Sequence, residues 1–234
     1  MHFLGVIGAK VLFQFKAINF LAECYDFQMS IYGMDNLMSD KGEETGQFEG
    51  KFLLAMPTLE ASIFDRSIIY MCAHSHDGAM GFQVNKPCDM TIKELISKTD
   101  IGQETKSISK SSAVTSNLVR YGGPVDEHRG FVLHSGDYHC DTTIPICEHV
   151  YLTSNVEILR SIIHGEGPSR LAVSLGYAGW GPGQLEQEVA DNAWLTLDAD
   201  IDVVFDPRHE GKYERMLVAM GITPAHFIAQ AGSA

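Results

Sequence analysis

The sequence predicts a single α+β domain with a mainly antiparallel sheet and about four helices. The chain has 234 residues, 45% of them hydrophobic, which is enough for one well-filled core. Short runs rich in β-branched and aromatic residues, separated by glycine-containing turns, are typical of short strands. Strands and helices follow one another irregularly and not in a repeating βαβ order, which favours an antiparallel sheet.

The first part of the chain is expected to be separate from the domain. Residues 1–46 are interpreted as an N-terminal extension that is flexible, or that reflects a mis-assigned start, with Met34 and Met38 as candidate starts. Lys10 and Lys16 interrupt the apolar stretch near its beginning. We therefore expect neither a secretory signal nor a membrane-spanning helix there.

The domain is expected to cover residues 47–234. Residues 99–117 are rich in Ser, Thr and Lys and lack aromatic side chains, which predicts a mobile loop. Apolar runs predict eight strands. They are expected at 51–56, 67–72, 79–84, 118–121, 130–134, 150–153, 171–175 and 201–205.

Two helices are predicted from capping patterns followed by apolar stripes. Thr91 with Glu94 forms a capping-box pattern at the start of a helix over 91–98. Ser154 begins a second pattern of this kind, before a helix that Gly165 can end.

Two more helices are predicted in the C-terminal third of the chain. The glycine-rich segment 176–183 is interpreted as a turn that leads into a polar helix at about 184–192. Asp206 and Pro207 are a favourable cap and first position for a last helix that ends near residue 221.

The charge balance disfavours direct binding to nucleic acid. The chain carries 30 acidic and 17 basic side chains, a formal net charge of −13. A phosphate backbone would be repelled unless the basic residues gathered on one face, and the sequence contains no such cluster.

The cysteines indicate a reducing compartment. Their number is odd, their spacing is irregular, and no C-x-x-C pair suggests a zinc site or dithiol chemistry. We therefore expect a cytoplasmic protein with free thiols and no cofactor.

The segment HSHDGAMGFQVNKP, residues 74–87, raises the question of a metal site. His74 and His76 would lie on the same face of a strand, at a spacing that suits two metal-bound imidazoles. However, Asp77 and Gly78 form a favoured turn pair, and a histidine beside a turn is usually solvated. The turn is the favoured interpretation, and we predict no metal.

Other motifs are equally open to a structural interpretation. Gly179, Gly181 and Gly183 could present N–H groups to an anion, but they match no nucleotide-binding pattern, and turn formation is favoured. Ser135 lies between His134 and an aspartate, yet neighbours in sequence do not make a catalytic triad. We predict no catalytic residues from these motifs.

Several blocks in order resemble the bacterial AlgH/YqgE family. The resemblance rests on F-L-L-A-M-P (52–57), I-F-D-R-S-I-I-Y (63–70), H-x-x-x-G-A-M-G-F-Q-V-N-K-P (74–87), G-G-P-V (122–125), R-G-F-V-L-H (129–134), L-G-Y-A-G-W-G-P-G-Q-L-E-Q-E (175–188) and D-N-A-W-L (191–195). It implies a bifurcated, partly barrel-like sheet flanked by helices in a bacterial cytoplasmic protein. It implies no settled activity, although some members are described as candidate transcriptional regulators.

The function expected from these observations is that of a non-enzymatic regulatory or accessory protein. It would act through a protein partner or a small ligand held in a groove near the loops at 74–87, 122–134 and 176–186. Any effect on transcription would be indirect. The alternative is an unrecognised hydrolase in which His74 or His134 acts as the base and Arg66 or Lys86 binds an anionic substrate. The candidate ligand-binding residues are Arg66, His74, Asn85, Lys86, Gly122, Gly123, His134 and Trp180.

Overall fold

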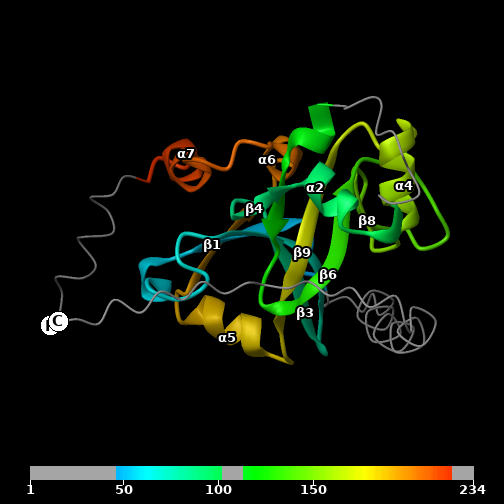
Figure 1. The fold of residues 1–234 in the computed structure, drawn as a ribbon. Coiled ribbons are helices and arrows are strands. Elements are labelled where there is room, and N and C mark those ends of the chain that lie inside the picture. Colours follow the sequence, from blue (N-terminus) through cyan, green and yellow to red (C-terminus); the bar gives the residue numbers. More distant parts are fainter. Residues whose placement is uncertain (1–45, 102–112, 223–234) are drawn as a thin grey trace, which may run out of the picture.

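The structure confirms the α+β fold class and the mainly antiparallel, bifurcated sheet. The computed structural model describes residues 46–101 and 113–222. Its ten-stranded sheet follows the order β10-β1-β2-β3-β9-β6-β8-β7, and β4 and β5 branch from it beside β9 (Figure 1). The pairing of β5 with β9 is parallel and the other pairings are antiparallel. The strands are β1 (Lys51–Ala55), β2 (Ile68–Ser75), β3 (Gly78–Gln83), β4 (Pro87–Thr91), β5 (Leu118–Tyr121), β6 (Val125–His134), β7 (Ile144–Cys147), β8 (Val150–Thr153), β9 (Leu171–Trp180) and β10 (Trp194–Asp198).

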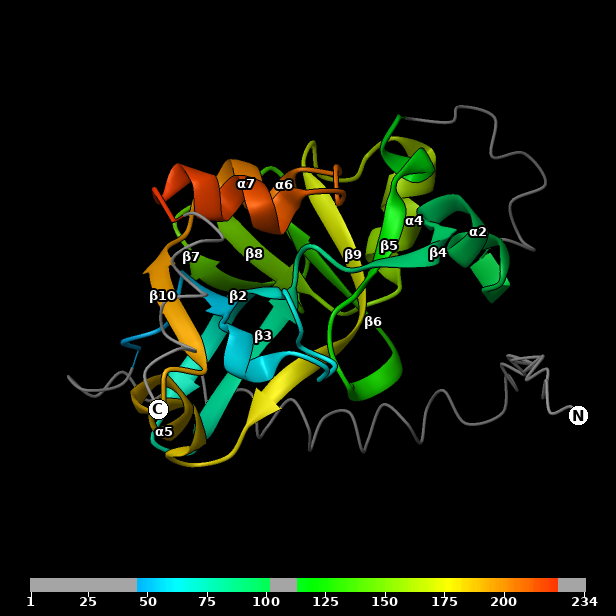
Figure 2. The same cartoon turned by 90° about the vertical axis from the view of Figure 1, so that its left-hand side faces the viewer.

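Helices flank the curled sheet on three sides. Figures 1 and 2 show α6 and α7 on one side, α5 on the opposite side, and α2 with α4 on a third. The helices of the described residues are α2 (Ile92–Ser97), α4 (Glu157–His164), α5 (Gln184–Ala190), α6 (Ile201–Phe205) and α7 (Lys212–Ala219), with short 3-10 helices at Pro57–Leu59 and Ala113–Ser116.

The apolar core has three parts, and each part anchors one group of helices. The largest fills the inside of the curled sheet, where Phe82 and Phe131 pack with ring centroids 5.2 Å apart, and α6 and α7 close it. The second joins Leu185 of α5 to the sheet. The third joins Ile96 of α2 and Ile162 of α4 to the sheet. Burial of these faces is the main stabilising contribution to the fold.

The segment 201–205 is a helix, and its prediction as a strand was wrong. The Asp200 side chain accepts a hydrogen bond from the Asp202 N–H at 2.9 Å and caps the helix start. Asp206 lies at the other end of α6, so it does not begin the last helix. That helix, α7, begins later, after Gly211 in the left-handed conformation. The β-branched run favours a strand locally, and the cap and tertiary contacts override it.

Strand β9 is longer than predicted, because residues 176–180 continue it where a turn was expected. Ala79 of β3 pairs with Trp180 at the end of β9. The turn is limited to residues 181–183, before α5. Gly176 has φ of 68°, which lets the strand bend as it crosses from β6 towards β3.

The helix caps give a mixed result. The capping box of Thr91 and Glu94 is present at α2, as predicted. Gly165 ends α4 with φ of 78°, also as predicted. The predicted N-terminal cap of α4 was wrong: Val156 occupies that position, and the Glu157 N–H donates to Asn155 Oδ1 at 2.9 Å and not to Ser154.

Strands β4, β7 and β10 were not predicted. Strand β7 contains Pro145, which lacks an N–H group and is tolerated because β7 pairs only with β8 at the edge of the sheet. Strand β10 forms the other edge. Residues 87–91, 144–147 and 194–198 are short and half exposed, so they lack the long apolar runs that identify a strand.

Two predictions fall outside the described residues. The extension at 1–46 lies there except for its last residue, and so does the centre of the loop predicted to be mobile, residues 102–112. Within the described ranges, no helix combines the length and the apolar character that crossing a membrane requires.

Candidate functional site

Arg66, Asn85 and Lys86 lie together, and they hold a loop in place. Asn85 Nδ2 donates to the Arg66 carbonyl at 2.8 Å, and Lys86 Nζ donates to the Asp65 carbonyl at 2.6 Å. The Arg66 side chain forms an ion pair with Glu214 of α7. These contacts fasten the segment between β1 and β2 to the end of β3 and to α7.

His74 lies at the end of β2 that is far from Arg66, and Trp180, at the end of β9, is close to His74. Both side chains contact α5. His74 is only 4% exposed, and its Nε2 lies 2.8 Å from Glu186 Oε1. Arg66 lies eight residues earlier along the chain, which is about 25 Å along an extended strand. His76, the other histidine of the motif, is exposed and lies beside Asp77.

Glu188 fixes both tryptophans beneath α5. Its Oε2 accepts hydrogen bonds from Trp180 Nε1 at 2.9 Å and from Trp194 Nε1 at 2.7 Å. Gln184 Nε2 donates to the other carboxylate oxygen at 2.9 Å. One carboxylate therefore satisfies two indole N–H groups and an amide, which explains how an acidic side chain lies against an aromatic pair.

We expect Glu188→Ala to lower the free energy of unfolding by about 2–4 kcal/mol, because it leaves the two indole donors without an acceptor. Urea unfolding followed by tryptophan fluorescence measures the change. Gln187→Ala on the exposed side of α5 is the control and is expected to cost under about 0.5 kcal/mol. Equal costs for the two variants would contradict this role of Glu188.

Gly122 and Gly123 lie inside the sheet, where they shape the backbone. The Gly122 N–H donates to the Leu175 carbonyl at 2.8 Å, and its carbonyl accepts from the Gln83 N–H at 2.8 Å. A Cβ at Gly122 would lie 2.1 Å from the Gly176 carbonyl oxygen. Both backbone groups of Gly122 are thus used to connect β5 to its neighbours.

His134 lies in a third place, at the end of β6. It is fully buried, with Nδ1 2.8 Å from the Ser135 carbonyl oxygen and Nε2 2.9 Å from Thr153 Oγ1. Burial lowers the pKa of His134 below its ordinary value, with partial opposition from the Ser135 carbonyl. The ring of Tyr151 stacks against it.

The eight predicted residues therefore do not converge on one groove. His134 pairs with Leu171 at the start of β9, and Trp180 ends the same strand, which separates them by up to about 30 Å. Over the ranges 46–101 and 113–222, no three His, Cys, Asp or Glu side chains are placed to hold a metal ion. A ligand role for the individual residues stays a prediction.

A groove lies along α6, at the His134 end of the sheet. It consists of a cleft of about 720 Å³ and a second of about 310 Å³, which share Arg170, Asp202 and Phe205. We call this surface the α6 groove. Its other lining residues are Val114, Asn117, Ser135, Gly136, Glu148, His149, Tyr151, Ser169, Leu171, Ala199, Asp200, Ile201, Asp206, Pro207 and Arg208.

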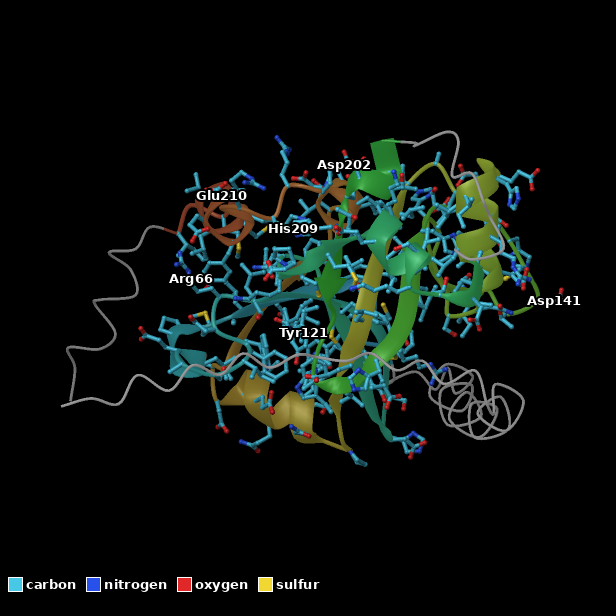
Figure 3. The ribbon with its side chains drawn as sticks, viewed as in Figure 1. Arg66, Tyr121, Asp141, Asp202, His209 and Glu210 are labelled. Carbon is cyan, nitrogen blue, oxygen red and sulfur yellow. The ribbon has the colours of Figure 1, made fainter. Side chains whose placement is uncertain are left out.

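Arg170 lies at the centre of the α6 groove. Its Nη2 donates to Asp202 Oδ1 at 2.7 Å, and its guanidinium carbon lies 4.9 Å from the centroid of the Phe205 ring. Figure 3 shows Asp202, His209 and Glu210 on the same side of the sheet, where Figure 1 places α6 and α7. The exposed ion pair contributes under about 1 kcal/mol, so Arg170 can exchange partners at little cost.

The wall of the groove beside β6 is held by Asp137. Its Oδ1 accepts from the Ser135 hydroxyl at 2.6 Å, and its Oδ2 accepts from the Ser169 N–H at 2.9 Å. Partial burial would raise the pKa of Asp137, but these hydrogen bonds outweigh it and lower the pKa to about 2. A carboxylate of this kind is a weak base, so Asp137 is suited to positioning the loop and not to activating the serine.

Two buried basic side chains support α6 from behind. Arg120 donates to the Val204 carbonyl at 2.6 Å and to the Asp206 carbonyl at 3.1 Å. Lys212 Nζ lies within hydrogen-bond distance of the carbonyl oxygens of Val84, Val203 and Asp206, at 3.2, 3.2 and 2.7 Å. The last carbonyls of a helix have no partner within it, and these side chains supply one. The short helix is therefore a fixed wall of the groove.

Sequence reasoning missed the groove because five separate chain segments build it. They are residues 114–117, 135–136, 148–151, 169–171 and 199–208. No spacing pattern within any one segment marks a shared surface. The predicted strand at 201–205 also concealed the helix on which the groove depends.

Comparisons with known proteins agree with this fold. A family model described as AlgH-like matches residues 52–225. A UPF0301 protein of Brucella melitensis is 47% identical over 192 residues, which cover 82% of this chain and 96% of that protein. A UPF0301 protein of Rhizobium etli is 45% identical over 191 residues, which cover 82% and 95%.

Solved structures show the same architecture. The solution structure of the AlgH protein from Pseudomonas aeruginosa has 33% sequence identity and a TM-score of 0.61, and the match covers 79% of this chain and 95% of that one. A crystal structure of a Corynebacterium diphtheriae protein has 18% identity and a TM-score of 0.57, covers 82% and 95%, and shares the fold alone. Together with the matched family model, these similarities show that the chain belongs to the AlgH-like family.

Proposed function

We propose that this protein is a non-enzymatic regulatory or accessory protein that binds a protein partner in the α6 groove. The observation that carries the proposal is the groove itself, which joins two clefts across Arg170 and Phe205. It combines aromatic and aliphatic surface with charged side chains at its rim. Concave surfaces of this composition are typical of binding sites.

The bonds made by the buried polar residues support binding over catalysis. A hydrolase needs a nucleophile, a base and a group that stabilises negative charge within hydrogen-bond reach of one another. His74 and His134, the two candidate bases, lie at opposite ends of the sheet and are already engaged by Glu186 and Thr153. Arg66 and Lys86, the candidate anion-binding residues, hold a loop elsewhere.

We also propose that the protein acts in the cytoplasm and that any effect on transcription is indirect. The cysteines of the described residues, Cys72, Cys88, Cys140 and Cys147, carry free thiols, which suits a reducing compartment. The net charge of −13 opposes direct contact with DNA. A partner that itself binds nucleic acid would reconcile these properties with a regulatory role.

Photo-crosslinking tests the proposal. A photoreactive amino acid is placed at Glu148, which lies at the groove rim with its side chain 87% exposed, and at Glu166, an exposed residue beyond α4. In lysate of the native host, we expect a reproducible crosslinked protein from position 148 and none from position 166.

The outcomes separate the functional alternatives. Crosslinking of the same protein from both positions, or from neither, would contradict a partner in the α6 groove. Turnover of a metabolite mixture by the purified protein would support the hydrolase alternative instead.

A further inference from the structure

The charges of the α6 groove restrict what can bind there. Its lining contains four carboxylates, Glu148, Asp200, Asp202 and Asp206, but only two arginines, Arg170 and Arg208. Both arginines already have acidic partners inside the groove: Arg170 lies 2.7 Å from Asp202, and Arg208 lies 2.9 Å from Asp206.

The surplus of negative charge lies at one end of the groove. Glu148 is 87% exposed, at the turn between β7 and β8. Across the larger cleft, Asp200 is also exposed and uses one carboxylate oxygen to cap α6. The net charge of the whole chain, −13, is of the same sign as these carboxylates.

The floor of the groove is apolar between these charges. Tyr151, Ala199, Ile201 and Phe205 contribute it. The aliphatic part of a lysine or arginine side chain can lie on such a floor while its charged end reaches the acidic rim. Phosphates and acidic peptides would be repelled by the carboxylates of Glu148 and Asp200 in the same place.

We infer that the occupant of the α6 groove is a basic segment of a partner protein, in which Lys or Arg side chains alternate with aliphatic ones. This inference rests on the proposed function and adds the chemistry of the partner to it. The aliphatic and aromatic floor distinguishes a polypeptide from a small polyamine, which offers charge without branched side chains to cover that surface.

A labelled peptide tests the inference on the full-length protein. A fluorescein-labelled peptide of alternating Lys and Val is titrated with the protein and followed by anisotropy, beside a matched peptide of alternating Glu and Val. We expect the Lys peptide to bind, the Glu peptide not to bind, and spermidine to displace the Lys peptide poorly. Since the rim is exposed, the affinity is expected to fall as salt is raised.

Charge reversal locates the contact. Glu148→Lys with Asp202→Lys is expected to weaken binding of the Lys peptide at least about tenfold. Glu166→Lys with Asp89→Lys changes the net charge equally at exposed positions outside the groove and is expected to weaken binding under about threefold. If the reversed groove variant fails to fold, Glu148→Gln with Asp202→Asn replaces it, with a smaller loss of about threefold to fivefold.

Three results would overturn the inference: no binding of the Lys peptide, equal losses in the groove and control variants, or spermidine binding as tightly as the peptide. If crosslinking from position 148 captures a partner but the Lys peptide does not bind, the basic chemistry is wrong while the proposed function stands. If the Lys peptide binds in the groove and no partner is crosslinked, the proposed function fails on its own.

Discussion

Replacing Gly122 by alanine is expected to destabilise the fold by at least about 3 kcal/mol, or to prevent folding. The added Cβ would lie 2.1 Å from the Gly176 carbonyl oxygen and 3.1 Å from the Gly176 carbonyl carbon. These neighbours are backbone atoms of β9, which is paired on both sides. The strain cannot be relieved by turning a flexible side chain.

Gly130→Ala in β6 is the matched control, because nothing lies within 4 Å of a Cβ at that position. We expect it to change the free energy of unfolding by under about 0.5 kcal/mol. Urea unfolding followed by circular dichroism compares the two variants. A Gly122→Ala protein as stable as Gly130→Ala would show that β5 and β9 can separate, and that the close approach is not needed.

The second large effect concerns the pH dependence of stability and Lys212, which is 2% exposed. Burial, together with the nearby Arg120 charge, lowers the pKa of Lys212 from its ordinary 10.5 to about 7. Between these two values the unfolded chain binds a proton that the folded protein lacks, so stability rises with pH. Below about pH 7 Lys212 is protonated in both the folded and the unfolded state, so it no longer makes stability depend on pH.

Lys212→Met removes the titrating group while keeping a side chain of similar length. We expect the free energy of unfolding of the natural protein, relative to that of Lys212→Met, to increase by about 2 kcal/mol between pH 7 and pH 9. The comparison cancels the ionisation of buried groups common to both proteins, such as Cys72, whose pKa burial raises. Urea unfolding at a series of pH values measures the difference. A difference that stays constant, or that shrinks with rising pH, would contradict a pKa of Lys212 lowered by burial.

Local signals in the sequence predicted the features that are determined locally. The capping box of Thr91 and Glu94 needs only four neighbouring residues, and Gly165 ends α4 by its own backbone freedom. The fold class followed from the mixture of short strands and helices. The family was evident from several ordered motifs, and the comparisons confirm it.

Features that depend on distant contacts were not predictable in this way. Helix α6 has a β-branched sequence, and the Arg120 side chain that binds its last carbonyls lies 84 residues earlier in the chain. The glycines of β9 suggested a turn, whereas Gly176 allows a strand to pass close to Gly123. The site residues are dispersed because they too depend on contacts between distant segments. The directions of the strands place His74 and His134 at opposite ends of the sheet, and the sequence does not reveal these directions.

We propose that this protein acts through the α6 groove. Hydrogen–deuterium exchange of the full-length protein, alone and with the partner captured from lysate, tests it most directly. We expect slower exchange on binding in residues 135–137, 148–151 and 199–206, with no change in α5. Protection confined to α5 and the His74 end of β2, or no protection in the groove segments, would contradict it.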